Sequence, residues 1–300
     1  MRFVVACSVM SAIGLLGCGA GGDGGSSAGG GGMAVGATGG SGGGGSNGAG
    51  AGGASATGGA GATSGGGSGG ANAGFKSAFS ATSVALDCND TAAQAMARGA
   101  PAVTFGSSTV LVGYQQIGAN DQDPIVARYD GDTQVFCEHS KKGGGVDSRA
   151  YGVTWDGAAK LYVVYTVVGG GTAFDGPAAG GWLSSYGDGG ASAKASVIGA
   201  LDATTGVVAK ATYVSSKLTK NGKLATNTHV PADAIHVQAD GALEFFGKPA
   251  YCTLNPDKSS MCDGAKMDYP QDYRARFSPD LSSMSCASAS GVSLVKTPCP

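Results

Sequence analysis

The most regular pattern along the chain is an alternation of apolar and polar residues, interrupted at intervals by short polar turns. Three segments each hold an apolar run, a turn with Gly106, Asp156-Gly157 or Asp240-Gly241, and a second run rich in Val, Leu, Tyr and Phe. Alternation at a period of two predicts strands, and glycine-containing turns between strands predict β-hairpins. The predicted hairpins are PAVTFGSSTVLVGYQ (101–115), AYGVTWDGAAKLYVVYT (150–166) and PADAIHVQADGALEFFGKPAY (231–251).

A second kind of hairpin is expected between the first three. Each member places an apolar or aromatic residue just before a polar turn, and three of the four end in a cysteine. The four segments are AFSATSVALDC (78–88), ARYDGDTQVFC (127–137), GALDATTGVVAKA (199–211) and ARFSPDLSSMSC (275–286). Two alternating hairpin types are typical of a repeat of four antiparallel strands, and they indicate a propeller-like or solenoid-like array.

The run DPIVARYDGDTQVFCEHSKKGGGVDSRAYGVTWDGAAKLYVVYT, residues 123–166, resembles bacterial β-propeller repeats of the SBBP-like kind. Those repeats have an aspartate-led strand similar to VARYD, a glycine-rich link, and two strands similar to YGVTWD and KLYVVYT. The resemblance implies that residues 75–300 form an all-β domain, a propeller-like array of four-stranded antiparallel blades. A β-sandwich built of the same hairpins is the alternative, because the spacing is irregular and only about three and a half blades can be counted.

Residues 19–74 consist almost entirely of Gly, Ala, Ser, Thr and Asn and contain no aromatic residue. Such a segment has too little apolar surface to offset the conformational entropy lost on folding. We therefore expect a disordered Gly-rich linker, called the tether below, with a root-mean-square reach of about 40 Å.

The first residues, MRFVVACSVMSAIGLLGC, have one positive charge at Arg2 and then an apolar run that ends at Leu16. The run is shorter than the roughly 20 residues that a membrane-spanning helix needs. The pattern predicts a secretory signal peptide over residues 1–17.

The four residues Leu15-Leu16-Gly17-Cys18 resemble the bacterial lipobox. The resemblance implies that Cys18 is lipidated, becomes the mature N-terminus and anchors a bacterial lipoprotein to the membrane. An ordinary signal peptide with an incidental thiol is the alternative. Gly19 stands where an aspartate would hold a lipoprotein at the inner membrane, and this implies an outer-membrane lipoprotein, either periplasm-facing or on the cell surface.

Six cysteines remain in the predicted domain. An even number in an exported chain implies three disulfides, because compartments outside the cytoplasmic membrane are oxidising. We expect two bridges that close short loops and one that joins equivalent hairpin ends, namely Cys252–Cys262, Cys286–Cys299 and Cys88–Cys137. No metal site is expected, because the chain has no Cys-x-x-Cys motif and no clustered His-Cys pattern.

One short helix is expected in TAAQAMARG, residues 91–99. Thr91 and Gln94 have capping-box spacing, and Gly99 stands where a C-terminal cap belongs.

Catalytic motifs are not found, and no catalytic or cofactor-binding residue is predicted. His139, His229 and His236 lie in different segments and are interpreted as strand or surface residues. The Gly-x-Ser-x-Gly match at Ser68 lies in the low-complexity tether.

Paired aspartates occur in two places, and turns explain both pairs. Calcium binding by these carboxylates is the one cofactor hypothesis that they raise. The pairs are Asp121 with Asp123 and Asp130 with Asp132.

Two segments are candidates for a binding loop. Residues 167–194 carry Phe174, Trp182 and Tyr186 among glycines, and exposed aromatic rings could stack on a sugar or anchor a protein. Burial of these rings in another strand is the alternative. The second segment carries three lysines that could meet an anionic polysaccharide or lipid headgroup, or lie in a solvated turn: Lys217, Lys220 and Lys223.

The formal net charge of −2 gives no basic surface for nucleic acid. Together these patterns predict a non-enzymatic binding domain displayed at the cell envelope, facing a glycan or an envelope protein. The alternatives are an envelope hydrolase or lyase with carboxylates converging on the blade-loop face, and a structural spacer.

Overall fold

The computed structural model describes residues 74–119, 121–140, 147–169, 173–187, 193–220, 223–263 and 272–300. The predicted signal peptide, Cys18 and nearly all of the tether lie outside the described residues. All described residues belong to one compact unit, Gly59–Pro300. Within them, no helix has the length and apolar character required to cross a membrane.

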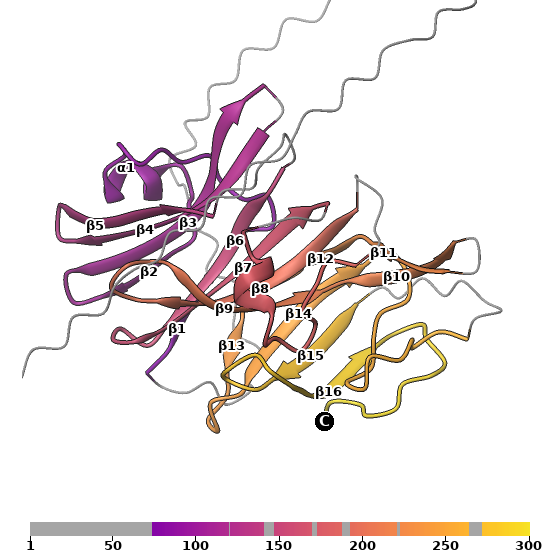
Figure 1. The fold of residues 1–300 in the computed structure, drawn as a ribbon. Coiled ribbons are helices and arrows are strands. Elements are labelled where there is room, and N and C mark those ends of the chain that lie inside the picture. The colour runs from indigo at the N-terminus through magenta and orange to yellow at the C-terminus, as the bar shows by residue number, and fades with distance from the viewer. Residues whose placement is uncertain are drawn as a thin grey trace, which may run out of the picture. The chain divides into compact units, whose positions relative to one another are not determined.

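Three antiparallel sheets account for most of the described chain (Figure 1). The first sheet has the order β2-β3-β4-β5, with β2 Ala102–Phe105, β3 Ser108–Gly118, β4 Asp121–Asp130 and β5 Thr133–His139. The middle sheet has the order β1-β6-β7-β8-β9, with β1 Lys76–Phe79, β6 Arg149–Trp155, β7 Lys160–Val168, β8 Lys194–Asp202 and β9 Val208–Val214.

The third sheet has the order β12-β14-β15-β16, and β13 also pairs with β14. Its strands are β12 His229–Pro231, β13 His236–Val237, β14 Leu243–Pro249, β15 Tyr273–Phe277 and β16 Met284–Ala289. A separate hairpin joins β10 Ser216–Lys220 to β11 Lys223–Asn227, and the helices are α1 Ala92–Ala97 and α2 Asp175–Ala178.

Six of the seven predicted hairpins are confirmed as antiparallel pairs: β2–β3, β4–β5, β6–β7, β8–β9, β13–β14 and β15–β16. Their turns depend on residues that adopt a positive φ, including Gly106, Gly157 and Gly241 at 58°, 78° and 82°. Glycine reaches this region without the steric cost of a Cβ, and so the turn signals in the sequence were reliable.

The seventh hairpin prediction, over residues 78–88, is wrong. β1 pairs instead with β6, and Lys76 stands opposite Trp155. The chain after β1 then runs beside β3, where the N–H of Leu86 donates to the carbonyl of Tyr114. Leu86 is buried on the outer face of the first sheet, and that burial holds the segment away from β1.

Two large apolar cores join the three sheets. The first core contains Val110 and Val126 of the first sheet together with Val163 and Tyr165 of β7. The second contains Val164 of β7 together with buried residues of the third sheet. Successive residues of a strand point to opposite faces, and so β7 contributes to both cores and the middle sheet is covered on both sides.

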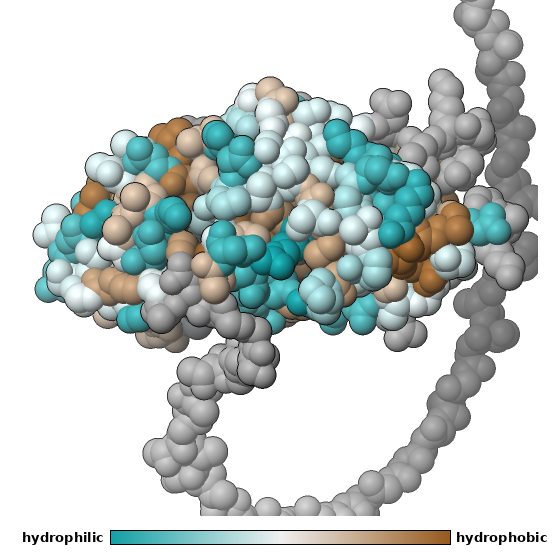
Figure 2. All heavy atoms as spheres, turned by 90° about the horizontal axis from the view of Figure 1, so that it is seen from below, coloured by the Kyte–Doolittle hydropathy of each residue, from teal (hydrophilic) through white to brown (hydrophobic). Residues whose placement is uncertain are grey.

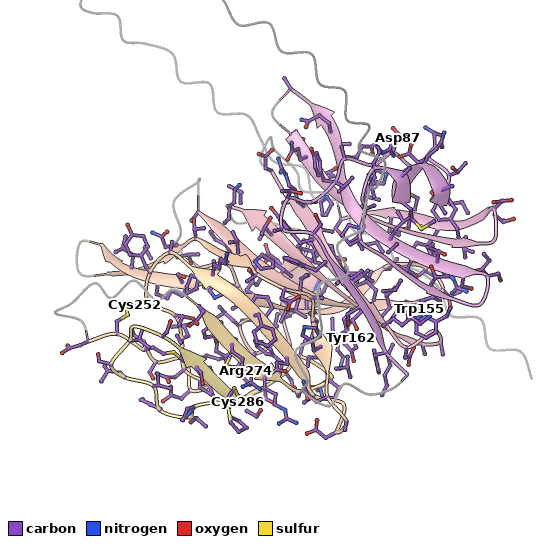
Figure 3. All side chains as sticks on the ribbon, turned by 180° about the vertical axis from the view of Figure 1, so that it is seen from behind. Asp87, Trp155, Tyr162, Cys252, Arg274 and Cys286 are labelled. Carbon is purple, nitrogen blue, oxygen red and sulfur yellow. A yellow bond between two sulfur atoms is a disulfide. The ribbon has the colours of Figure 1, made fainter. Side chains whose placement is uncertain are left out.

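The all-β prediction is confirmed, and among the described residues none of the sheets closes on itself. On its outer face the first sheet carries a smaller core that includes Leu111 and Ala95 of α1. The third sheet places charged side chains on its strands, among them Glu244 and Arg276. Arg274 of β15 is labelled in Figure 3.

The predicted helix is confirmed as α1, and the capping box is present. The hydroxyl of Thr91 accepts from the backbone N–H of Gln94 at 3.2 Å, and the Gln94 side chain accepts from the N–H of Thr91 at 2.8 Å. Gly99 follows the helix with a φ of 87°.

Replacement of the cap, Thr91→Ala, should lower the free energy of unfolding by about 1 kcal/mol, because the backbone N–H of Gln94 loses its acceptor. Urea unfolding followed by circular dichroism measures the change. Thr91→Ser keeps the hydroxyl and should lie close to wild type. An equal loss in both variants would show that the hydroxyl does not cap α1.

The three predicted disulfides are also confirmed. Their Cα–Cα distances are 5.6, 5.5 and 5.0 Å for Cys88–Cys137, Cys252–Cys262 and Cys286–Cys299.

Candidate functional site

The aromatic residues of the predicted binding loop lie inside the protein. Phe174, Trp182 and Tyr186 expose 1%, 4% and 2% of their surface. The ring of Phe174 packs on Tyr165 at 4.8 Å between centroids, and the indole N–H of Trp182 donates to the carbonyl of Pro256 at 2.8 Å. These side chains hold the loop against the two cores, and the prediction that they form an exposed binding surface is corrected.

The lysine-rich segment forms the β10–β11 hairpin. Lys217 exposes only 8% of its surface, and its ammonium group donates to the hydroxyl of Thr226 at 3.2 Å. Lys217 therefore does not present its charge to a ligand. The side chains of Lys220 and Lys223 lie outside the described part of the structure.

The paired aspartates do not assemble a calcium site within the described residues. Asp130 accepts from the hydroxyl of Ser108 at 2.6 Å and forms an ion pair with Arg128 at 3.1 Å. Asp123 is buried on β4, and Asp132 is exposed in the turn after it. The one group of three potential metal ligands in the described chain contains no aspartate.

A cleft of about 230 Å³ lies at the end of the edge strand β5, and we call it the β5 cleft. Its wall on the β5 side is polar, whereas its other walls come from the α2 region and the β8–β9 turn. The lining residues are Glu138, His139, Ser140, Ala173, Pro177, Gly206, Val207 and Val208.

Gly206 allows the β8–β9 turn to approach β5 and to form one wall of the β5 cleft. Gly206 has a φ of 77°, and a Cβ at this position would lie 2.5 Å from the ring of Phe136 and 3.0 Å from Cγ of Glu138. Only a residue without a side chain allows the turn to approach β5 this closely. The cleft therefore depends on a contact between residues about 70 positions apart.

The lining of the β5 cleft includes the polar residues Glu138 and Ser140 beside apolar ones. Val207, at its rim, exposes 53% of its surface, which is unusual for a valine in this domain. On the face drawn in Figure 2, hydrophobic residues form separate patches among hydrophilic ones. A mixed polar and apolar cleft can orient a ligand by hydrogen bonds while it buries part of an apolar face.

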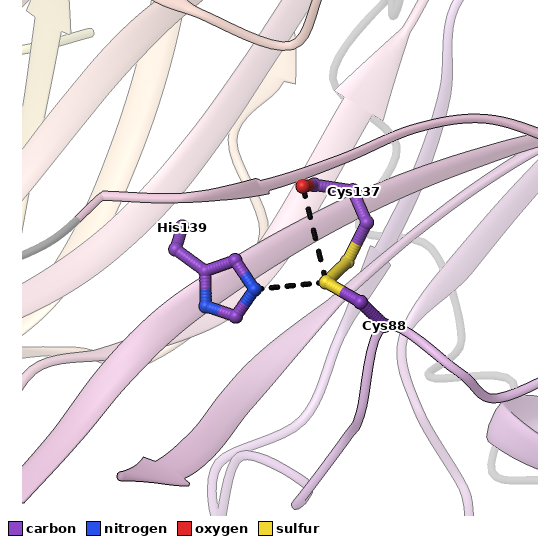
Figure 4. Close-up of side chains that lie close together, drawn as sticks. All are labelled: Cys88, Cys137 and His139. Carbon is purple, nitrogen blue, oxygen red and sulfur yellow. Dashed lines mark hydrogen bonds between the residues drawn. A yellow bond between two sulfur atoms is a disulfide. The ribbon is translucent and has the colours of Figure 1, made fainter.

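His139 connects the cleft to a disulfide. Its Nε2 lies 2.8 Å from Sγ of Cys88, and Cys137 lies two residues before it on the same face of β5 (Figure 4). The other ring nitrogen, Nδ1, is buried without a hydrogen-bond partner among the described residues. We call Cys88, Cys137 and His139 the His139 cluster.

The His139 cluster has a negative charge nearby. The backbone N–H of Asn89 donates to the carboxylate of Asp87 and is the largest cause that lowers the pKa of Asp87, with smaller contributions from the side chains of Asn89 and Gln115 and from the charge of His139. Asp87 is therefore ionised at neutral pH.

The sequence contains a pattern that points to the His139 cluster, although it is not a Cys-x-x-Cys motif. In Cys137-Glu138-His139 the cysteine and the histidine are two positions apart on a predicted strand, and so they share a face. The predicted Cys88–Cys137 bridge would have brought the third residue to the same place.

The other two histidines lie in β12 and β13, as expected for strand residues. His229 is fully buried between the rings of Phe245 and Tyr273, at centroid distances of 5.8 and 5.1 Å. Burial lowers its pKa to about 3, so the ring is neutral. His236 lies 3.4 Å from Asp233 near the surface.

A second hollow of about 150 Å³ lies on the third sheet, and its polar groups are bound to one another. Arg274 pairs with Glu244, and Arg276 pairs with Asp240. The side-chain amide of Gln238 donates to Glu244 at 2.7 Å. These groups already have partners, so we place the candidate site at the β5 cleft.

No protein-family model matches the chain, and comparisons with curated proteins and with solved structures found no match. Functional inference therefore depends on the β5 cleft, the disulfides and the sequence signals.

Proposed function

We propose that the protein is an envelope lipoprotein that is anchored through Cys18 and displays a non-enzymatic binding domain, with the β5 cleft as the contact point for a glycan. The observation that carries the proposal is the composition of the cleft. Glu138 and Ser140 offer polar groups on one side, and Pro177 and Val207 offer apolar contacts on the other.

The disulfides support the export part of the proposal. Three bridges in one domain are typical of a protein that folds outside the cytoplasm, where thiols are oxidised. A lipidated cysteine followed by a tether of about 40 Å reach would hold such a domain near the membrane and leave it free to turn.

The volume of the β5 cleft fits a site that holds one part of a larger ligand. At about 230 Å³ it lies below the ~300–1,000 Å³ of most small-molecule pockets. A single sugar ring fits this space, and the rest of a glycan chain would extend along the exposed edge of β5. An envelope protein that inserts one side chain is the alternative ligand.

We also propose that the three sheets are successive blades of a propeller-like array. Two of them have four-stranded meanders, β2–β5 and β6–β9, and the segment that resembles bacterial propeller repeats runs from β4 to β7 across their junction. Removal of the outer cover of the first sheet, residues 84–100, would expose the apolar face on which another blade could pack.

The enzyme alternative finds less support in the β5 cleft. A hydrolase or lyase of the predicted kind would use several carboxylates that act with a histidine or arginine, whereas this cleft has one carboxylate, that of Glu138. A glycan bound here would be held without a second acidic group to assist bond cleavage.

The anchoring part is tested by protease treatment of intact cells. Release of the domain from wild type, and its absence from the cell surface in Cys18→Ser, is the expected result for surface display. Protection that is lost on permeabilisation would place the domain on the periplasmic side. Membrane association that survives Cys18→Ser would overturn lipid anchoring.

The binding part is tested with purified protein on immobilised peptidoglycan and on a panel of neutral and acidic oligosaccharides. Val207→Asp places a charge in the apolar wall and should weaken binding at least tenfold, because the apolar contact and its dehydration are lost. Ile117→Asp is the matched control, since Ile117 is equally exposed, at 52%, and lies outside the cleft.

Glu138→Gln should also weaken glycan binding, because a charged acceptor is replaced by a neutral amide. Asp132→Asn removes an exposed carboxylate from the neighbouring turn and should leave affinity unchanged. If all four variants bind the glycan with the same affinity, the β5 cleft is not the binding site. Binding of an envelope protein without any glycan would favour the alternative ligand.

A further inference from the structure

One of the three disulfides differs from the others in its surroundings. Cys88 and Cys137 are both partly exposed. Each of the other bridges has one buried half, Cys262 or Cys286. A reagent in solution therefore reaches the Cys88–Cys137 bridge more readily than the other two.

This bridge also has a nitrogen ligand beside it. Nε2 of His139 lies 2.8 Å from Sγ of Cys88, and the ligand atoms of Cys88, Cys137 and His139 all lie within 4.8 Å of one another (Figure 4). No other group of three such ligand atoms is found in the part of the chain that the structure describes. Two cysteine sulfurs and one imidazole are a typical ligand set for zinc.

The backbone already has a spacing that suits a metal ion. Two thiolates at Zn–S distances of about 2.3 Å in a tetrahedral site lie about 3.8 Å apart. The Cα atoms of Cys88 and Cys137 are 5.6 Å apart, so rotation of the two side chains can open this sulfur–sulfur distance without movement of the strands. Because Cys88 and Cys137 are partly exposed, solvent can supply the ligand for a fourth position.

We propose that reduction of the Cys88–Cys137 disulfide converts the His139 cluster into a site for a thiolate-binding divalent metal ion such as Zn²⁺. Cys88, Cys137 and His139 are the three protein ligands, and water takes the open position. In the oxidised protein the sulfurs are bonded to each other and the site is closed. The proposal does not depend on glycan binding.

The chemistry balances with a dithiol as the reductant. The dithiol gives two electrons and two protons to the bridge and becomes a disulfide, while Cys88 and Cys137 become thiols. Zinc then binds the two thiolates and the neutral imidazole, and the two thiol protons pass to solvent.

The test uses the full chain in detergent, oxidised or reduced by a phosphine without oxygen, and titrated with Zn²⁺ against a chromophoric chelator. Reduced wild type should retain one zinc equivalent that the oxidised protein does not bind. Reduced His139→Gln should bind it at least tenfold more weakly, because one ligand is lost. His236→Gln is the matched control and should equal wild type.

The phosphine also reduces the other cysteines, which could bind zinc themselves. The double variant Cys88→Ser, Cys137→Ser distinguishes zinc bound at the His139 cluster from zinc bound by those cysteines. It should lack the tight equivalent, and Co²⁺ added to it should give no sulfur-to-metal charge-transfer band. A tight equivalent that persists in the double variant, or in His139→Gln at unchanged affinity, overturns the proposal. So does equal binding by oxidised and reduced wild type.

Thermal unfolding of the reduced protein distinguishes zinc bound at the folded His139 cluster from zinc bound by cysteines of unfolded chains. A folded site raises the melting temperature of reduced wild type when zinc is added, and it does not do so in His139→Gln. Absence of any zinc-dependent rise in reduced wild type counts against the proposal, because metal would then bind only unfolded chains.

Discussion

Acidification from pH 6 to pH 4 should destabilise the protein through His229 by an amount on the order of 1 kcal/mol for each pH unit. Burial lowers the pKa of His229 from 6.5 to about 3 in the folded protein. Between these values the unfolded chain binds a proton that the folded protein does not bind. The stability that the neutral ring provides is therefore complete above pH 6.5 and declines as the pH falls towards 3.

The packing around His229 explains why the proton is excluded. The ring lies between two aromatic rings, and a Cβ on Gly247 would lie 2.2 Å from its Cε1. Ser196 donates to the backbone carbonyl of His229 at 2.7 Å, and the ring atom Nε2 has no partner among the described residues. Burial removes the ring from bulk solvent, and a positive charge here would therefore be poorly stabilised.

Urea unfolding at pH 7, 6, 5 and 4 with the disulfides intact measures the effect. Carboxylates titrate in part of the same range, so the informative quantity is the difference between wild type and His229→Leu, which has no titrating ring. That difference should shift in favour of the variant as the pH falls, by an amount on the order of 1 kcal/mol per pH unit. His236→Gln, at the half-exposed histidine, is the control. Parallel pH profiles for wild type and His229→Leu would contradict the prediction.

Loss of the Cys88–Cys137 bridge should lower the free energy of unfolding by about 4 kcal/mol, which is a large part of the stability of a single domain. The two cysteines are 49 residues apart, and a bridge over so long a loop removes many conformations from the unfolded chain. It also ties the segment after β1 to the edge strand β5, across the core that contains Leu86.

The double variant Cys88→Ser, Cys137→Ser, unfolded in urea without reductant, tests this prediction. The variant Cys252→Ser, Cys262→Ser is the comparison, because its loop of 10 residues should be worth only about 3 kcal/mol. If the short-loop variant loses as much stability as the long-loop variant, or more, loop closure is not the main contribution of the Cys88–Cys137 bridge.

Local signals explain why so much of the fold was predictable. Turn glycines such as Gly157 and Gly241 require a positive φ that few other residues tolerate, and they located the hairpins. The capping box of α1 lies within four residues, and two of the three disulfides close loops of 10 and 13 residues.

The errors came from contacts between distant residues. The pairing of β1 with β6 joins residues almost 80 positions apart, and no local pattern specifies it. Burial of Phe174 and Trp182 depends on the space that the two cores leave for a glycine-rich loop. The β5 cleft exists because Gly206 meets Phe136, and the two residues lie in different sheets.

The position of β1 has a mechanical consequence. Tension on the chain before residue 74 enters the domain through this strand of four residues, which among the described strands pairs with β6 alone. The hydroxyl of Ser77 donates to Thr154 at 2.7 Å and to the carbonyl of Ile235 at 3.0 Å, and the ammonium group of Lys76 donates to the carbonyl of Thr104. A pulling force is thereby shared among all three sheets, and detachment of β1 would withdraw Ala78 from the first core and Phe79 from the second.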